Sequence, residues 1–147
     1  MAQPTTAKFG KFRVLLGDGQ SPEVFTVPCG FTSKALTVSK NLTEINLPDC
    51  LDPDAAAWVG RDVESLSAAI TGEGVLAAES IDAWYAALLS TSSLNVRIEI
   101  EFPLITYTWQ GLMHVSEFAH NADQGGRTTA NVTMASDGEL VLTNATT

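Results

Sequence analysis

Apolar and polar positions alternate through most of the chain, a pattern typical of half-buried β-strands. The alternation is clearest where Val96, Ile98, Ile100 and Phe102 are separated by charged side chains. The same pattern predicts further strands over residues 12–16, 24–27, 32–43, 61–77, 105–118, 127–135 and 139–142. We therefore expect a mainly β fold of about seven or eight strands.

One stretch, residues 80–90, has the period of a helix instead. Its apolar side chains recur at i, i+3, i+4, i+7 and i+8 and form one stripe: Ile81, Trp84, Tyr85, Leu88 and Leu89. We expect Ser80 to cap the N-terminus, and the stripe to pack on the strands, because so short a helix is unstable alone in water. The prediction is a single domain over residues 1–147, a β-sandwich or open barrel with this helix on its flank.

Two segments break the strand pattern. Residues 1–10 are mostly small and polar, and we expect them to form a flexible N-terminal arm. Residues 44–62 read as a long irregular loop, because prolines and aspartates argue against a long strand there. Its distinctive residues are Pro48, Asp49, Asp52, Pro53, Trp58 and Val59. Since an indole gains free energy by burial, this loop either folds back on its own domain or docks on another subunit.

The charge of the chain excludes one class of function. Eight basic and 17 acidic side chains give a net charge of −9. Nucleic-acid-binding proteins concentrate Lys and Arg against phosphates, so this balance argues against them. No apolar run is long enough to span a membrane and no signal segment is visible, so we expect folding in a cytoplasm with Cys29 and Cys50 reduced.

Candidates for catalysis or metal binding are few. His114 and His120 stand six residues apart on one predicted strand, so we expect them to share a face. At roughly 20 Å they would be too far apart to share a metal ion. The aspartates of residues 44–62 lack the glycine and glutamate of a calcium-binding loop. Glu99 and Glu101 share a strand face at about 7 Å, which resembles a glycosidase pair but is more typical of a solvated surface. We expect no enzyme and no cofactor or metal.

The order of several motifs along the chain resembles one known family. They lie at residues 47–58, 61–68, 71–77, the helix with Trp84, 95–100, 126–128 and 136–139. In this order, over about residues 30–143, the chain resembles the major tail tube protein of long-tailed, non-contractile bacteriophages. The family has no catalytic residues to carry over.

The resemblance implies a structural virion protein that is assembled in the host cytoplasm. Six copies would close a ring, and rings would stack into a tail tube whose inner sheets form a β-barrel around a channel. Residues 1–8 and 44–62 would bridge subunits and rings. The implied partners are further copies and the tail tip, tape measure and terminator proteins. Genomic DNA would pass through without specific binding, and no part of the chain would insert into a membrane.

Polar strand faces are the candidates for the channel wall, where negative charge would repel DNA. We select Arg97, Glu99, Glu101, Thr37, Ser39 and Asn41. Whether the strand of Glu99 faces the channel or the outer solvent stays open. Two other functions are considered. One is the tube of a contractile tail or type VI-like secretion apparatus. The other is a carbohydrate-binding β-sandwich, for which the sequence lacks an aromatic or calcium platform.

Overall fold

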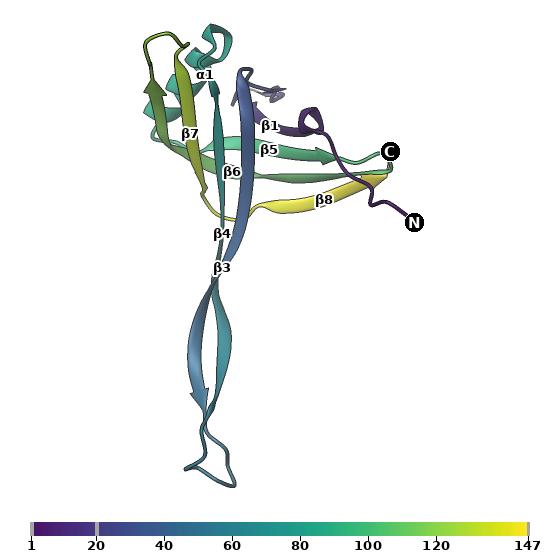
Figure 1. Cartoon of the computed structure of the whole chain (residues 1–147), viewed down its shortest axis with the longest axis vertical. Coiled ribbons are helices and arrows are strands. Elements are labelled where there is room, and N and C mark those ends of the chain that lie inside the picture. Colours follow the sequence, from purple (N-terminus) through teal and green to yellow (C-terminus); the bar gives the residue numbers. More distant parts are fainter. Residues whose placement is uncertain (1, 20, 147) are drawn as a thin grey trace.

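The computed structural model describes residues 2–19 and 21–146, and over these the chain forms eight strands, one α-helix and a short 3₁₀ helix. The elements, shown in Figure 1, are η1 (Phe9–Lys11), β1 (Phe12–Gly17), β2 (Phe25–Thr26), β3 (Phe31–Leu47), β4 (Trp58–Val75), α1 (Ala78–Leu89), β5 (Leu94–Glu101), β6 (Ile105–Asn121), β7 (Thr129–Ser136) and β8 (Val141–Thr146). Met1 and Thr147, the ends of the predicted domain, lie outside the described residues. The prediction of a mainly β fold with one helix is confirmed.

A single antiparallel sheet contains all eight strands, in the order β2-β1-β5-β6-β7-β4-β3, with β8 paired to β6. The long strand β6 joins two layers of this sheet. Its first half pairs with β5 and β8, and its second half pairs with β7. In Figure 1, β1, β5 and β8 run across β3, β4 and β7, so the sheet folds over on itself as a sandwich.

The core lies between the two layers and under α1. Its buried side chains come from alternate positions of the strands, together with one helix residue: Val14, Leu16, Ile70, Trp84, Val96, Ile98, Met113, Val115, Val132 and Met134. The Trp84 indole packs edge-on against Phe31, with ring centroids 5.6 Å apart, and in a tilted arrangement against Phe118, with ring centroids 6.0 Å apart. Because one face of each strand is buried here, its other face is left for polar side chains.

The helix α1 differs from the prediction in two respects. Its N-cap is Ala77, and Ser80 lies buried in the first turn, where its hydroxyl donates a hydrogen bond to the Cys29 carbonyl at 3.2 Å. Leu89 is 80% exposed, so the prediction that it packs on the strands is wrong for the single chain. At 3.6 residues per turn, Leu89 points about 140° away from the buried Trp84.

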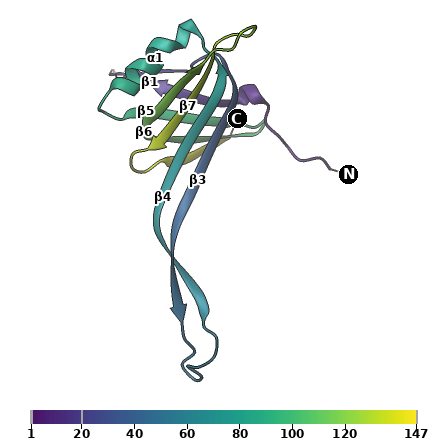
Figure 2. The ribbon, with the colours of Figure 1, turned by 60° about the vertical axis from the view of Figure 1, so that its left-hand side comes forward.

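Strands β3 and β4 are longer than predicted and form a hairpin that extends far beyond the body (Figures 1 and 2). Their pairing continues to Leu47 opposite Trp58, so only residues 48–57 connect them. The prediction that residues 44–62 are irregular is therefore wrong at both ends of that range. Pro48 and Pro53 lie beyond the last pair and do not interrupt the ladder, which is why the strands can continue so far.

Candidate functional site

The described residues contain no cluster suited to catalysis on a metal. No three His, Cys, Asp or Glu side chains among them gather as ligands, and no helix within them is both long and apolar enough to cross a membrane. The two histidines do not share a face, because a register shift between Val115 and Glu117 puts His114 opposite Ala135 but His120 opposite Ala130. The surfaces of the sheet and of the hairpin are the candidate functional sites.

One face of the hairpin is apolar and continues the core face of the sheet. Cross-strand pairing puts Leu36 opposite Ile70, Val38 opposite Ala68, Lys40 opposite Leu66 and Leu42 opposite Val63. We call the exposed part the apolar hairpin face; its members are Val38, Leu42, Val63 and Leu66, which are 46–66% exposed. A contiguous apolar strip of this kind is unfavourable in water and is typical of an interface.

The opposite face of the same strands is polar, and it continues over β7 and the second half of β6. Thr71 lies opposite Thr133, which in turn lies opposite Glu117, and Glu73 lies opposite Asn131. We call this surface the polar sheet face; it consists of Thr37, Ser39, Asn41, Ser65, Ser67, Thr71, Glu73, Glu117, Thr129, Asn131 and Thr133. The hydroxyls of Ser39 and Ser67 are 3.2 Å apart and share a hydrogen bond. Three of the six predicted channel residues, Thr37, Ser39 and Asn41, thus belong to one continuous surface.

The other three predicted channel residues lie on the second layer. Glu99 accepts a hydrogen bond from the Arg13 guanidinium at 2.8 Å, and Glu101 pairs with Arg13 at 3.5 Å and with Lys11 at 3.4 Å. The Arg97 guanidinium lies 4.1 Å from the centre of the Phe25 ring. Because the core separates the two layers, these side chains and the polar sheet face point to opposite sides of the molecule. The structure therefore does not bring the six candidates together.

Sequence reasoning missed two acidic members of the polar sheet face. Glu73 stands between Gly72 and Gly74 and reads as part of a glycine-rich bend. Glu117 is displaced by the bulge in β6, which shifts the alternation that sequence analysis relies on. No simple sequence signal marks the bulge, so only the strand register places these carboxylates beside Thr133 and Asn131.

The predicted inter-subunit residues gather at the far end of the hairpin. Trp58 is 87% exposed and Leu51 is 95% exposed. The Asp49 carboxylate accepts a hydrogen bond from the Leu51 amide at 2.8 Å, which shapes the connection locally. Pro48, Asp52, Pro53 and Val59 are exposed as well. The segment does not fold back on its own domain, so that alternative is wrong.

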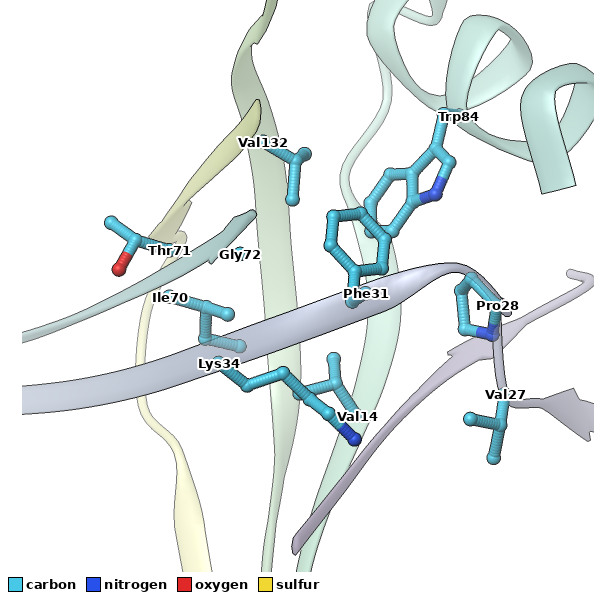
Figure 3. A pocket seen from close by; sticks show the side chains of 10 residues that line it. All are labelled: Val14, Val27, Pro28, Phe31, Lys34, Ile70, Thr71, Gly72, Trp84 and Val132. Carbon is cyan, nitrogen blue, oxygen red and sulfur yellow. The ribbon is translucent and has the colours of Figure 1, made fainter. Parts of the chain in front are cut away.

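A small, partly open pocket lies where the two layers meet below α1 (Figure 3). Its lining is Val14, Val27, Pro28, Phe31, Lys34, Ile70, Thr71, Gly72, Trp84 and Val132, and its volume is about 20 Å³, enough for about one water molecule. The buried Trp84 Nε1 has no hydrogen-bond partner among the described residues. The size of this pocket suits one water molecule and is too small for an organic ligand.

Lys34 reaches from β3 toward the start of β1. Its ammonium group donates a hydrogen bond to the Phe12 carbonyl at 2.7 Å and lies 4.5 Å from the centre of the Phe9 ring. Burial, and to a smaller extent the charge of Arg13, lower the pKa of Lys34 below its ordinary value. This contact links the hairpin layer to the segment at which the N-terminal arm begins.

Comparison with known proteins identifies a family and a fold. A sequence model of a family described as phage tail tube protein matches residues 6–142. Among curated proteins, no sequence matches the chain.

Three solved structures illustrate the shared fold. The tail of an empty gene transfer agent particle, refined with C6 symmetry, has a TM-score of 0.73 at 17% identity, covering 97% of this chain and 99% of that chain. The SPP1 tail tube has a TM-score of 0.67 at 6% identity, with coverage of 92% and 78%. The sheath-tube complex of PVC, an extracellular contractile injection system, has a TM-score of 0.59 at 14% identity, with coverage of 95% and 92%. At such identities the likeness shows the fold alone.

Proposed function

Because the chain belongs to the phage tail tube protein family, and is therefore a structural protein of the virion tail, we propose that six copies close a ring and that rings stack into the tube. The number six is supported by the C6 symmetry of the gene transfer agent tail. One layer of the sheet consists of β3, β4, β7 and the second half of β6. Among the described residues, one edge of strand β3 in this layer is unpaired. Joining such edges between copies would close a barrel and leave no open strand.

The polar sheet face lines the channel in this proposal, and genomic DNA passes along it without specific binding. The observation that carries the proposal is the row of Thr, Ser and Asn side chains across three neighbouring strands, β3, β4 and β7. Glu73 and Glu117 add negative charge, which repels the phosphates and holds DNA off the wall. Glu99 and Glu101 are instead engaged with Arg13 and Lys11 on the other layer, so we assign them to the outside of the tube.

The hairpin bridges neighbouring rings. Its tip presents Trp58, Leu51 and Leu47, which are at least 57% exposed, at a distance from the body where only another subunit can cover them. Burial of these side chains supplies several kcal/mol of association free energy, on the order of 1.5–3 kcal/mol for each. The hairpin thus takes part in both kinds of contact: the edge of β3 joins copies within a ring, and the tip joins neighbouring rings.

Other proteins bind the first and last rings. Chains with this fold occur in structures of a baseplate and a tube-terminating cap of the anti-feeding prophage, and of a PVC sheath/tube terminator. By analogy, the partners here are tail tip, tape measure and terminator proteins. The same structures also support a second candidate, the tube of a contractile tail. Binding of a sheath protein to the tube would distinguish a contractile tail from a non-contractile one. We propose no enzymatic activity for either tube.

Electron microscopy of the purified protein at high concentration tests this function. We expect rings and stacked tubes with a central channel, and sedimentation should show polymers that grow with protein concentration. Protein that stays monomeric on long incubation, with and without an added tail-tip complex as template, would contradict the proposal.

A further inference from the structure

One flank of α1 carries two apolar side chains that the subunit leaves exposed. Leu89 is 80% exposed, and Tyr85, one turn earlier on the same side of the helix, is 37% exposed. We call these two residues the helix flank. The Tyr85 hydroxyl shares a hydrogen bond with His120 Nε2, and its ring packs against the Phe118 ring with centroids 5.5 Å apart. These contacts to β6 fix the position of the helix flank beside the end of that strand.

The end of β6 beside the helix flank is an open edge of the sheet. β5 pairs with β6 only as far as Met113, and among the described residues 114–121 pair on one side alone, with β7. The other open edge of this layer belongs to β3. Three antiparallel pairings separate the two edges, so β3 and β6 run in opposite directions. When a ring closes, β3 of one copy can therefore pair antiparallel with β6 of the next.

We propose that the helix flank of one copy covers the body end of the apolar hairpin face of the next copy in the ring, with Leu89 packed on Val38. This inference rests on the proposed tube, because ring closure brings the two edges together. α1 lies on the core side of β6, where Trp84 contacts Phe118 and Phe118 lies opposite the buried Val132. The apolar hairpin face continues the same side of the sheet. A β3 strand added to the edge of β6 thus presents its apolar side chains on the side where α1 lies.

The strand register places Val38 at the right level for this contact. Four strands of the layer share a row of core-facing residues, one from each strand: Val115, Met134, Ile70 and Leu36. A row that continues across the junction puts Leu36 of the next copy beside Val115, and puts Val38, two residues along β3, beside Met113. Val38 therefore enters the junction at the end of the β6 edge where β5 begins.

Leu89 lies near the same level because α1 ends there. Only residues 90–93 separate Leu89 from Leu94, the first residue of β5, which pairs with Met113. Val38 is 47% exposed in its own subunit, so each of the two side chains lacks a cover that the other can supply. Burial of both apolar side chains is favourable. In the ring, Leu89 thus packs on strands of another copy, which the single chain does not contain.

Crosslinking in assembled tubes tests this contact. The full-length protein carries Cys29→Ser and Cys50→Ser, since both native thiols are exposed, and adds Val38→Cys and Leu89→Cys. After treatment of tubes with a short bis-maleimide, we expect a ladder on a denaturing gel that ends at six copies, because the links close within one ring. Dilute monomer should give no link, since β4, β7 and β6 separate the two positions within one chain.

Ala83→Cys in place of Leu89→Cys is the matched control. Ala83 is exposed and lines the groove between α1 and the β1–β2 turn, so it should give no ladder. Normal tubes without a Val38–Leu89 link, or with an equal Val38–Ala83 link, would overturn the contact and leave the tube role intact. A ladder that continues beyond six copies, or a link in dilute monomer, would also overturn it. Failure of the unmodified protein to form tubes would instead overturn the proposed function.

Truncation of Leu89 gives a second measurement that needs no cysteine. Leu89→Ala should leave the unfolding of dilute monomer unchanged, because the side chain is 80% exposed there. It should raise the protein concentration required for tube formation about tenfold, since a buried apolar contact is lost. Val141→Ala, which truncates an exposed side chain on β8, is the control and should assemble like the wild type. Normal assembly of Leu89→Ala, or a loss of monomer stability in it, would overturn the inference.

Discussion

At the scale of single residues, Trp84 is buried in the core, whereas Trp58 is exposed at the tip of the hairpin. Trp84 is 3% exposed and joins α1 to the sheet through Phe31 and Phe118. Trp84→Ala should lower the free energy of unfolding by about 3–5 kcal/mol, because it leaves a cavity. Trp84→Phe should cost less, since the indole N–H has no partner among the described residues. Urea denaturation of dilute monomer measures both; equal stability of Trp84→Ala and wild type would contradict the packing.

Lys34 gives a prediction on pH. Its pKa in the folded protein is below the ordinary 10.5, through burial and the Arg13 charge. Between the two values the unfolded chain binds more protons than the folded chain, so the contribution of Lys34 to stability rises with pH there. Relative to Lys34→Met, the wild type should therefore gain stability as pH rises from 8 toward 10.5. Urea denaturation at both pH values checks this, and a constant difference would mean that Lys34 titrates alike in both states.

At the scale of elements, the hairpin separates assembly from folding. Replacing Asp49–Ala57 with the two-residue turn Asn-Gly, or changing Trp58→Ser, touches only exposed residues, so the monomer should keep its thermal stability. Both variants should form tubes poorly, because the first loses Leu51 from the apolar tip and the second loses Trp58. Thermal melting measures the stability of each variant, and electron microscopy of the same samples shows whether tubes form. If either variant melts at a lower temperature than the wild type, the tip instead belongs to the core of its own subunit.

The elements also show how far sequence reasoning reached. Strands such as β5 were predictable because alternation records burial of one face, as with Val96 and Ile98. The extent of β3 and β4 was not, because beyond the body no core imposes alternation and Pro48 looked like an interruption. The bulge before Glu117 reverses the alternation of β6, so that each later side chain points to the face opposite to the one expected. Sequence alternation therefore missed Glu117 as a member of the polar sheet face and wrongly placed both histidines on one face. Side chains at an interface are suited to contacts with a partner subunit. Because the single chain does not contain that partner, its own alternation does not predict them.

At the scale of the whole molecule, the folded-over sheet gives the subunit two outward faces with different charge arrangements. On the polar sheet face, no described residue forms an ion pair with Glu73 or Glu117. On the other face, Glu99 and Glu101 are balanced by Arg13 and Lys11. In a closed ring only one face can meet the channel. The unbalanced face is the one suited to repel DNA, because its field is not neutralised locally.

Charge reversal of the two faces tests this assignment. On the channel reading, Glu73→Lys with Glu117→Lys leaves the monomer folded and the tube assembled, but puts two cations per copy on the wall, where they attract phosphates. DNA ejection from assembled tails should then slow, and slow more at low salt, where screening is weak. Glu99→Lys with Glu101→Lys is the matched pair. It should lower monomer stability, because Arg13 and Lys11 then face like charges, yet assembled tails should eject DNA at the normal rate. If the second pair slows ejection and the first does not, the β5 strand lines the channel and the subunit sits in the ring with its layers reversed.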